Sequence, residues 1–97
     1  MVSGFVKSEF EVFGQVQGVF FRKYTKEEAE RLGLKGWCAN TNAGTVKGLI
    51  EGPQEKIKLM KEWLQHKGSP QSKIERTVFS DEEQIESLTH RDFKIKK

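Results

Sequence analysis

The sequence predicts one α+β domain in the split βαβ arrangement, an antiparallel sheet with two helices packed on one face. Residues 6–13 alternate between apolar and polar side chains, which is the spacing of a half-buried strand. Two later segments carry apolar residues at helical spacing, and two short strand-like runs joined by a turn lie between them. The order is therefore β-α-β-β-α-β. A chain of 97 residues fits a single domain over residues 1–97, with residues 1–4 expected to be disordered or frayed.

The first half of the chain is predicted to form one strand and one helix. In the strand, Lys7, Glu9, Glu11 and Phe13 alternate with Val6, Ser8, Phe10 and Val12. The helix presents one apolar stripe, made by Phe21, Thr25, Ala29 and Leu32. Gly33 is suited to the left-handed position that ends a helix. Two helices can cover only one face of such a sheet, which explains why charged Glu9 and Glu11 occur in a strand.

The second half supplies the remaining strands and the second helix. Residues 35–41 and 45–51 are predicted strands, joined by a turn with hairpin chemistry at Thr41-Asn42-Ala43-Gly44. Gly52-Pro53 ends the second of these strands and opens a helix whose stripe is Ile57, Met60, Trp63 and Leu64. Gly68-Ser69-Pro70 stops that helix. Residues 73–80 form a fourth predicted strand, 81–84 a polar turn, and 93–96 a short terminal strand.

Composition narrows the class of protein. Seventeen basic and fourteen acidic side chains give a net charge of +3, which suits an anionic ligand without indicating nucleic acid. No apolar run approaches the roughly 20 residues that span a bilayer, and no signal peptide is recognisable, so a cytoplasmic location is expected. Cys38 is the only cysteine, and with two scattered histidines it forms no metal-ligand pattern. We expect no metal or other cofactor.

The most informative stretch is the glycine-containing loop that precedes the first helix. It reads Gly14-Gln15-Val16-Gln17-Gly18-Val19-Phe20-Phe21-Arg22. Backbone N–H groups in such a turn can converge on an anion, and the helix N-terminus adds a favourable dipole. The guanidinium of Arg22 matches phosphate oxygens. The alternative for Arg22 is a solvated side chain, although a cation at a helix N-terminus meets an unfavourable dipole unless an anion is bound.

Asn40 is a second candidate, because it ends the strand before the hairpin turn. If that strand lay beside the first strand, its amide could approach the loop and hold a water without acting as a base. The alternative is that Asn40 is a turn-former, as Asn42 is. Neither His66 nor His90 has a catalytic partner at an interpretable spacing, so solvated positions are expected for both.

Two further features favour structural roles, and a third argues against a nucleotide-binding loop. Trp37 and Trp63 stand at strand and helical spacing, which favours the core over a ligand platform. The acidic run at residues 81–83 is typical of a solvated turn. The loop lacks both the Gly-Lys-Ser/Thr ending of a nucleotide P-loop and the dinucleotide-binding glycine spacing.

These segments resemble the acylphosphatases. The loop at residues 14–22 is similar to the first signature of that family, and Gly36-Trp37-Cys38-Ala39-Asn40-Thr41 with Gly44-Thr45-Val46 is similar to the second. The resemblance covers about residues 10–93. It implies a ferredoxin-like fold and metal-independent hydrolysis of acyl phosphates to carboxylate and phosphate. It further implies that Arg22 binds phosphate, that Asn40 positions water, and that a loop of backbone amides completes the site: Gln15, Val16, Gln17, Gly18, Val19, Phe20 and Phe21.

The resemblance implies small-molecule substrates, with aspartyl-phosphate protein intermediates as an alternative. A small charged domain without an obvious apolar stripe on its surface favours a monomer, and we expect no nucleic-acid or membrane partner. Cys38 replaces the usual valine, and Gln15 stands where a basic or another polar residue is common. The chain ends in Lys96-Lys97, whereas some members of the family end in an aromatic residue. Two other readings compete. A ferredoxin-like RNA-binding module would need basic residues interleaved with aromatics, a pattern that is missing. A phosphate-sensing domain would not need both Arg22 and Asn40.

Overall fold

The computed structural model describes residues 4–18 and 20–96. Residues 1–3, for which disorder was expected, lie outside these ranges. The described chain forms six strands and two helices in the order β1 (Phe5–Gln15), α1 (Phe21–Arg31), β2 (Lys35–Asn40), β3 (Val46–Pro53), α2 (Gln54–His66), β4 (Lys73–Phe79), β5 (Glu83–Gln84) and β6 (Phe93–Lys96). Every helix and every longer strand that the sequence predicts is present, within a few residues of the expected ends.

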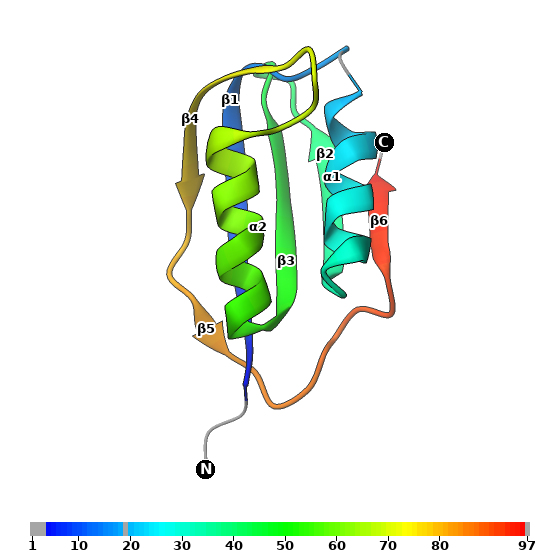
Figure 1. The fold of residues 1–97 in the computed structure, drawn as a ribbon, viewed down its shortest axis with the longest axis vertical. Helices are drawn as coiled ribbons and strands as arrows, with labels where there is room; N and C mark the ends of the chain where they lie inside the picture. Colours follow the sequence, from blue (N-terminus) through cyan, green and yellow to red (C-terminus); the bar gives the residue numbers. More distant parts are fainter. Residues whose placement is uncertain (1–3, 19, 97) are drawn as a thin grey trace.

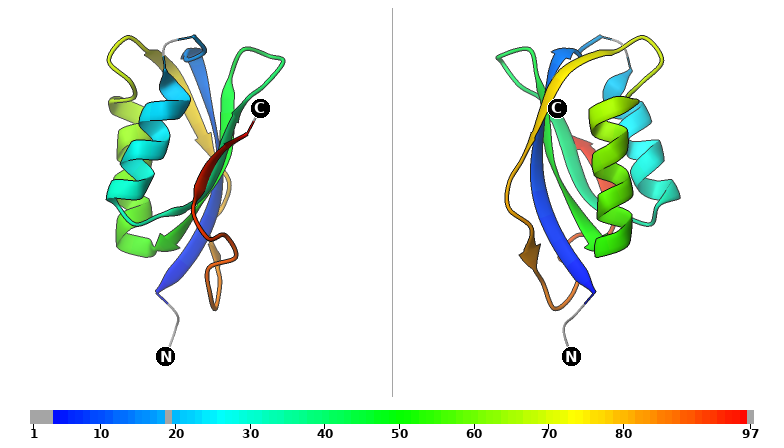
Figure 2. Two further views of the ribbon diagram at one scale, coloured as in Figure 1. Left: turned by 90° about the vertical axis from the view of Figure 1, so that its right-hand side faces the viewer. Right: turned by 60° about the vertical axis from the view of Figure 1, so that its left-hand side comes forward.

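The strands form one sheet in the order β4-β1-β3-β2-β6, and β5 pairs with a further part of β1. Both helices pack on the same face, and the other face is not covered by a helix (Figures 1 and 2). The predicted α+β class is confirmed. One feature differs, because β6 runs parallel to β2 and the sheet is mixed rather than antiparallel throughout. The connection after β5 crosses one end of the sheet, so β6 enters the edge in the direction of β2 (Figure 1).

The core lies between the sheet and the two helices. The rings of Phe21 in α1 and Trp63 in α2 meet there, with centroids 5.7 Å apart. Burying an apolar side chain of this size contributes about 1.5–3 kcal/mol. Because Phe21 is the first residue of α1, this contact fixes the helix end that faces the glycine loop. The helical stripes and the strand alternation are as predicted, with buried Val6, Ser8, Phe10 and Val12 from β1, Thr25 and Ala29 from α1, and Ile57, Met60 and Leu64 from α2.

The polar turn expected at residues 81–84 is partly wrong, because Glu83–Gln84 forms β5. β4 pairs with β1 only from Phe10 onward, so the earlier part of β1 offers a free edge that β5 covers. Lys7 and Glu83 form an ion pair across this edge at 3.7 Å. Both residues of β5 are exposed, and therefore no apolar alternation marks the strand in the sequence.

Glu51 is a fully buried carboxylate on the face opposite the helices. It accepts hydrogen bonds from the Thr89 N–H at 2.6 Å, the Thr89 hydroxyl at 2.8 Å and the His90 N–H at 2.6 Å. In the sheet register its neighbours are Lys7 on β1 and Lys35 on β2. Burial alone raises the pKa of Glu51, but the hydrogen bonds from Thr89 and His90 outweigh it and hold the pKa below its ordinary value. The carboxylate thereby fixes the connection that leads into β6.

Replacing Glu51 with Gln is expected to lower the free energy of unfolding by about 2 kcal/mol at neutral pH, because the amide nitrogen cannot accept from the buried donors. A lowered folded-state pKa means that the carboxylate stabilises the fold above its unfolded pKa of about 4.3. This contribution is lost as the pH falls through the folded pKa. The unfolding free energies of wild type and Glu51→Gln, measured with urea, should therefore approach each other as the pH falls from about 4.3 through the lower folded-state pKa.

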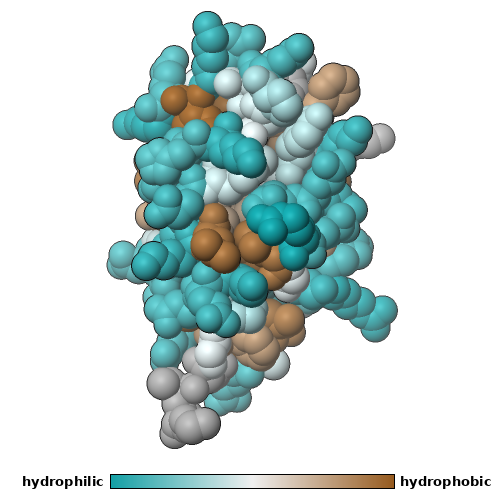
Figure 3. Space-filling model, in the orientation of Figure 1, coloured by the Kyte–Doolittle hydropathy of each residue, from teal (hydrophilic) through white to brown (hydrophobic). Residues whose placement is uncertain are grey.

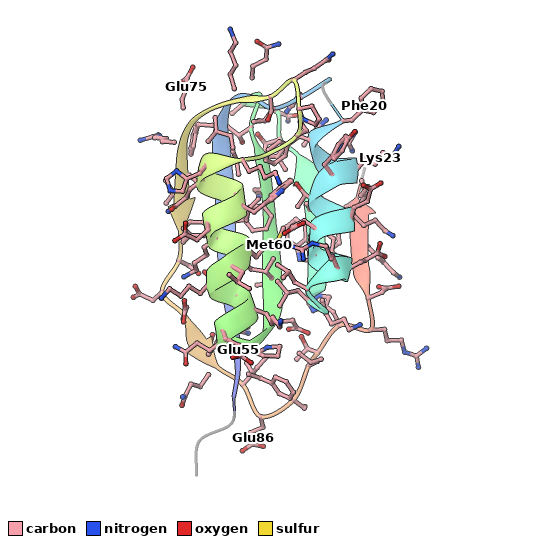
Figure 4. All side chains as sticks on the ribbon, viewed as in Figure 1. Phe20, Lys23, Glu55, Met60, Glu75 and Glu86 are labelled. Atoms are coloured by element: carbon pink, nitrogen blue, oxygen red, sulfur yellow. The ribbon has the colours of Figure 1, made fainter. Side chains whose placement is uncertain are left out.

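The matched control is Glu86→Gln, an exposed change in the same connection (Figure 4). It should shift the unfolding free energy by no more than about 0.5 kcal/mol. Equal effects of the two substitutions, or a Glu51→Gln effect that does not vary with pH, would contradict the role given to the buried carboxylate.

Candidate active site

The loop between β1 and α1 turns through residues with left-handed backbone. Val16 is buried, and its N–H donates to the Gly14 oxygen at 3.1 Å, which closes the end of β1. Gly18 has φ 74°, and Phe20 has φ 57° and ψ 24°. Turns of this kind aim successive backbone N–H groups into one concavity that suits an anion. Val19, also expected in this loop, lies outside the described residues.

The first turn of α1 begins without a cap. Among the described residues, no side chain hydrogen-bonds to its N–H groups, and the turn contains no acidic residue. The N–H groups of Gly18, Phe20, Phe21 and Arg22 have no hydrogen-bond partner within residues 4–18 and 20–96. Arg22 and Lys23 instead place two cations at the positive end of the helix dipole, which is unfavourable without an anion. Unsatisfied donors and surplus positive charge together suit a bound anion.

Arg22 is held between the first turn of α1 and the end of β6. Its Nη1 lies 3.4 Å from the Lys96 backbone oxygen, a long contact that leaves most of its N–H donors available. The backbone oxygen of Arg22 lies 3.8 Å from Sγ of Cys38 in β2. Burial raises the pKa of the Cys38 thiol to about 12, although the charge of Arg22 opposes this rise. The thiol is therefore protonated at neutral pH, as befits a packing residue rather than a nucleophile.

Asn40 reaches the same region without the direct pairing of its strand with β1 that the sequence suggests. Its strand, β2, does not lie beside β1, because β3 is between them. Cys38 is buried on the helix-covered face, and since strand side chains alternate, Asn40 lies on that face too, at the end of β2. No hydrogen bond to its side-chain amide occurs within the described part of the chain. The amide is thus free to hold a ligand or a water.

These groups surround one hollow of about 260 Å³ at the N-terminal end of α1. Arg22, Asn40 and the left-handed loop contribute its polar part. Phe20 and Lys23 are labelled at this end of the helix in Figure 4, and the C-terminal end of β6 lies beside it in Figure 1. The described residues that line the hollow are Val16, Gly18, Phe20, Phe21, Arg22, Lys23, Asn40 and Ile95. Lys23 and Ile95 were not among the predicted site residues.

Gln17 has a role that the sequence did not indicate. Its side-chain amide donates to the backbone oxygens of Thr41 and Thr45, both at 2.9 Å. The hydroxyls of these two threonines lie 2.6 Å apart, and the Thr45 hydroxyl donates to Glu11 at 2.6 Å. The loop between β1 and α1 is thereby tied to the hairpin that carries Asn40. This brace, rather than direct strand pairing, sets the distance between Asn40 and the loop.

Other predicted residues lie outside the hollow. Gln15 is the last residue of β1, opposite Lys73 of β4, and is not among the lining residues. His66 is exposed near the end of α2, whereas His90 is half-buried, with its Nδ1 3.3 Å from the Glu51 carboxylate. Trp37 lies on the sheet face opposite the helices, with the Lys96 ammonium 4.5 Å from its ring centroid.

A larger hollow of about 380 Å³ lies on the sheet face opposite the helices. Its lining includes Glu9 and Glu11, whose carboxylates would repel an anion, so it does not compete as a phosphate site. No cluster of three or more His, Cys, Asp or Glu side chains suited to a metal ion occurs in residues 4–18 and 20–96. None of the described helices is long and apolar enough to cross a membrane.

Fold and site together define an α+β domain of the ferredoxin-like class, in which the loop at the start of α1 presents unpartnered backbone N–H groups suited to an anion. The sequence model of the acylphosphatase family matches residues 8–95. Acylphosphatase-1 of Gallus gallus is 52% identical over 94 residues, which cover 97% of this chain and 95% of that protein. Acylphosphatase-2 of the same organism is 55% identical over 87 residues, or 89% of this chain and 84% of the relative.

Solved structures agree with these relatives. The acylphosphatase from Bacillus subtilis superposes with a TM-score of 0.86 at 34% identity, covering 95% of this chain and 99% of that one. The chain therefore belongs to the acylphosphatase family. It is an enzyme of that family, and its reaction is the hydrolysis of acyl phosphates.

Proposed function

We propose that this chain hydrolyses acyl phosphates without a metal ion, by direct attack of water on a phosphoryl group held in the loop. The observation that carries the proposal is the convergence of Arg22, Asn40 and unsatisfied backbone N–H groups on one hollow. The N–H groups of Gly18, Phe20 and Phe21 would bind the equatorial phosphoryl oxygens together with the Arg22 guanidinium. Donors fixed in advance stabilise the charge that is spread over these oxygens in the transition state.

The reaction transfers a phosphoryl group to water. The water oxygen, held by the amide of Asn40, forms a bond to phosphorus while the bond from phosphorus to the acyl oxygen breaks. The electron pair of the broken bond leaves with the carboxylate. One proton of the attacking water passes to a phosphate oxygen of the substrate, so the products are a carboxylate and inorganic phosphate.

The composition of the hollow favours an acyl phosphate over an ordinary phosphate ester. No Asp, Glu or His is among the described residues that line it, so no ordinary general acid stands near the reacting atoms. A carboxylate is a weak base and leaves without protonation, whereas an alkoxide leaving group needs an acid. The site therefore suits a leaving group that does not have to be protonated.

The substrate class proposed is small-molecule acyl phosphates. Aspartyl-phosphate groups on proteins carry the same mixed anhydride and are included in the proposal. Action as a monomer is part of the proposal, because Arg22, Asn40 and the loop donors already line one hollow without a residue from a second copy. Competing roles as a phosphate sensor or an RNA-binding module predict no turnover of benzoyl phosphate.

Replacing Arg22 with Gln is expected to lower kcat/KM for benzoyl phosphate by more than about 10³, because one side chain supplies both phosphate binding and transition-state charge. Inhibition by inorganic phosphate should weaken as well. The matched control is Arg31→Gln, the same change at the exposed far end of α1, where Arg31 pairs with Glu28. Equal activity of the two variants would overturn the role of Arg22.

Replacing Asn40 with Ala is expected to lower kcat by about 10²–10³ while the inhibition constant of inorganic phosphate stays close to wild type. The reason is that Asn40 holds the attacking water and not the phosphoryl group. Asn42→Ala in the exposed hairpin turn serves as the control and should retain activity. Near-normal kcat in Asn40→Ala, or an equal loss of phosphate binding, would contradict the water-positioning role.

A further inference from the structure

Phe20 has two unfavourable features at one position. Its side chain is 70% exposed, and it is the only non-glycine residue with positive φ among the described residues. A bulky residue in the left-handed region is strained, and such strain concentrates at functional sites. The loop needs the left-handed backbone to aim its N–H groups, but Gly or Asn would adopt that conformation more readily. Binding of phosphate therefore does not account for the aromatic ring.

A second apolar side chain contributes to the same hollow from the opposite end of the chain. Ile95 of β6 lies opposite Cys38 of β2 in register and on the same face as the buried Phe93. Its side chain is nevertheless 38% exposed, because it lines the hollow together with Phe20. Figure 1 shows the end of β6 beside the start of α1, and Figure 4 labels Phe20 at that same helix end.

The hollow thus combines polar and apolar groups. Arg22, Asn40 and the backbone donors match the phosphoryl group and the water, whereas Phe20 and Ile95 match neither. The rest of the helix-covered side is mostly hydrophilic, with a few separate apolar patches (Figure 3). An acyl phosphate whose phosphorus is bound in the loop must project its acyl group from the loop toward the mouth of the hollow. The apolar side chains there are the available contacts for that group.

We propose that Phe20 and Ile95 form a subsite for the acyl group, and that the enzyme favours acyl phosphates with a flat, apolar body over short ones. The inference rests on the proposed function and deepens it by naming the substrate class. An aromatic acyl group can stack on the Phe20 ring and contact Ile95, whereas an acetyl group is too small to reach both. The strained backbone of Phe20 then has a function, because it presents the aromatic ring to the substrate.

The test compares benzoyl phosphate with acetyl phosphate in wild type, Phe20→Asn and Ile95→Thr. Asn tolerates the left-handed backbone, and Thr keeps the β-branched shape that a strand favours. The ratio of kcat/KM for benzoyl phosphate to that for acetyl phosphate should fall about tenfold in each variant, mainly through KM. Leu59→Asn changes an exposed apolar residue on α2 outside the hollow, with an exposure between those of Phe20 and Ile95, and should leave the ratio unchanged.

Two results would overturn this inference alone. An equal loss on both substrates would mean that Phe20 acts through the loop backbone, and an unchanged ratio would mean that neither side chain contacts the acyl group. The inhibition constant of inorganic phosphate shows in each variant whether the loop itself is intact. If wild type hydrolysed neither substrate, the proposed function would fail, and the acyl subsite with it.

Discussion

The uncapped, positively charged start of α1 is the feature on which the rest of the site depends. A helix normally satisfies its first N–H groups with a polar or acidic side chain, and this one begins with left-handed Phe20 followed by Phe21, Arg22 and Lys23. The cost of exposed donors beside two cations is offset only when an anion binds. Phe21, packed against Trp63 in the core, holds this unfavourable turn in place without a ligand. The fold thus holds a helix start that suits an anion in place before any ligand binds.

Two sets of hydrogen bonds then position the remaining groups around that turn. The amide of Gln17 joins the loop to the hairpin through Thr41 and Thr45, which brings Asn40 to the hollow although β3 separates its strand from β1. On the other side of the sheet, buried Glu51 fixes the connection into β6, and β6 supplies both Ile95 and the Lys96 oxygen that Arg22 contacts. The site is therefore assembled from segments at both ends of the chain.

Local patterns were sufficient to predict the order of elements, because alternation in β1 and the stripes of the two helices are properties of short segments. The loop and Arg22 were found in the same way. Contacts between residues far apart in sequence follow no spacing rule and could not be predicted. They are the hydrogen bonds of Gln17 to the hairpin, the ion pair of Glu83 with Lys7, and the hydrogen bonds of Thr89 to Glu51. The left-handed conformation of Phe20 was also missed, since a phenylalanine gives no signal for positive φ. The sequence does not indicate that Ile95 belongs to the site either, because the residues of β6 are those of an ordinary edge strand.

In the proposed reaction water attacks phosphorus rather than the acyl carbon, and no metal ion is required. The most direct test is single turnover of benzoyl phosphate in ¹⁸O-labelled water with excess EDTA, followed by mass analysis of both products. Attack on phosphorus without a metal ion predicts full activity, with the label in inorganic phosphate and none in benzoate. Label in the benzoate carboxyl group, or loss of activity with EDTA, would contradict it.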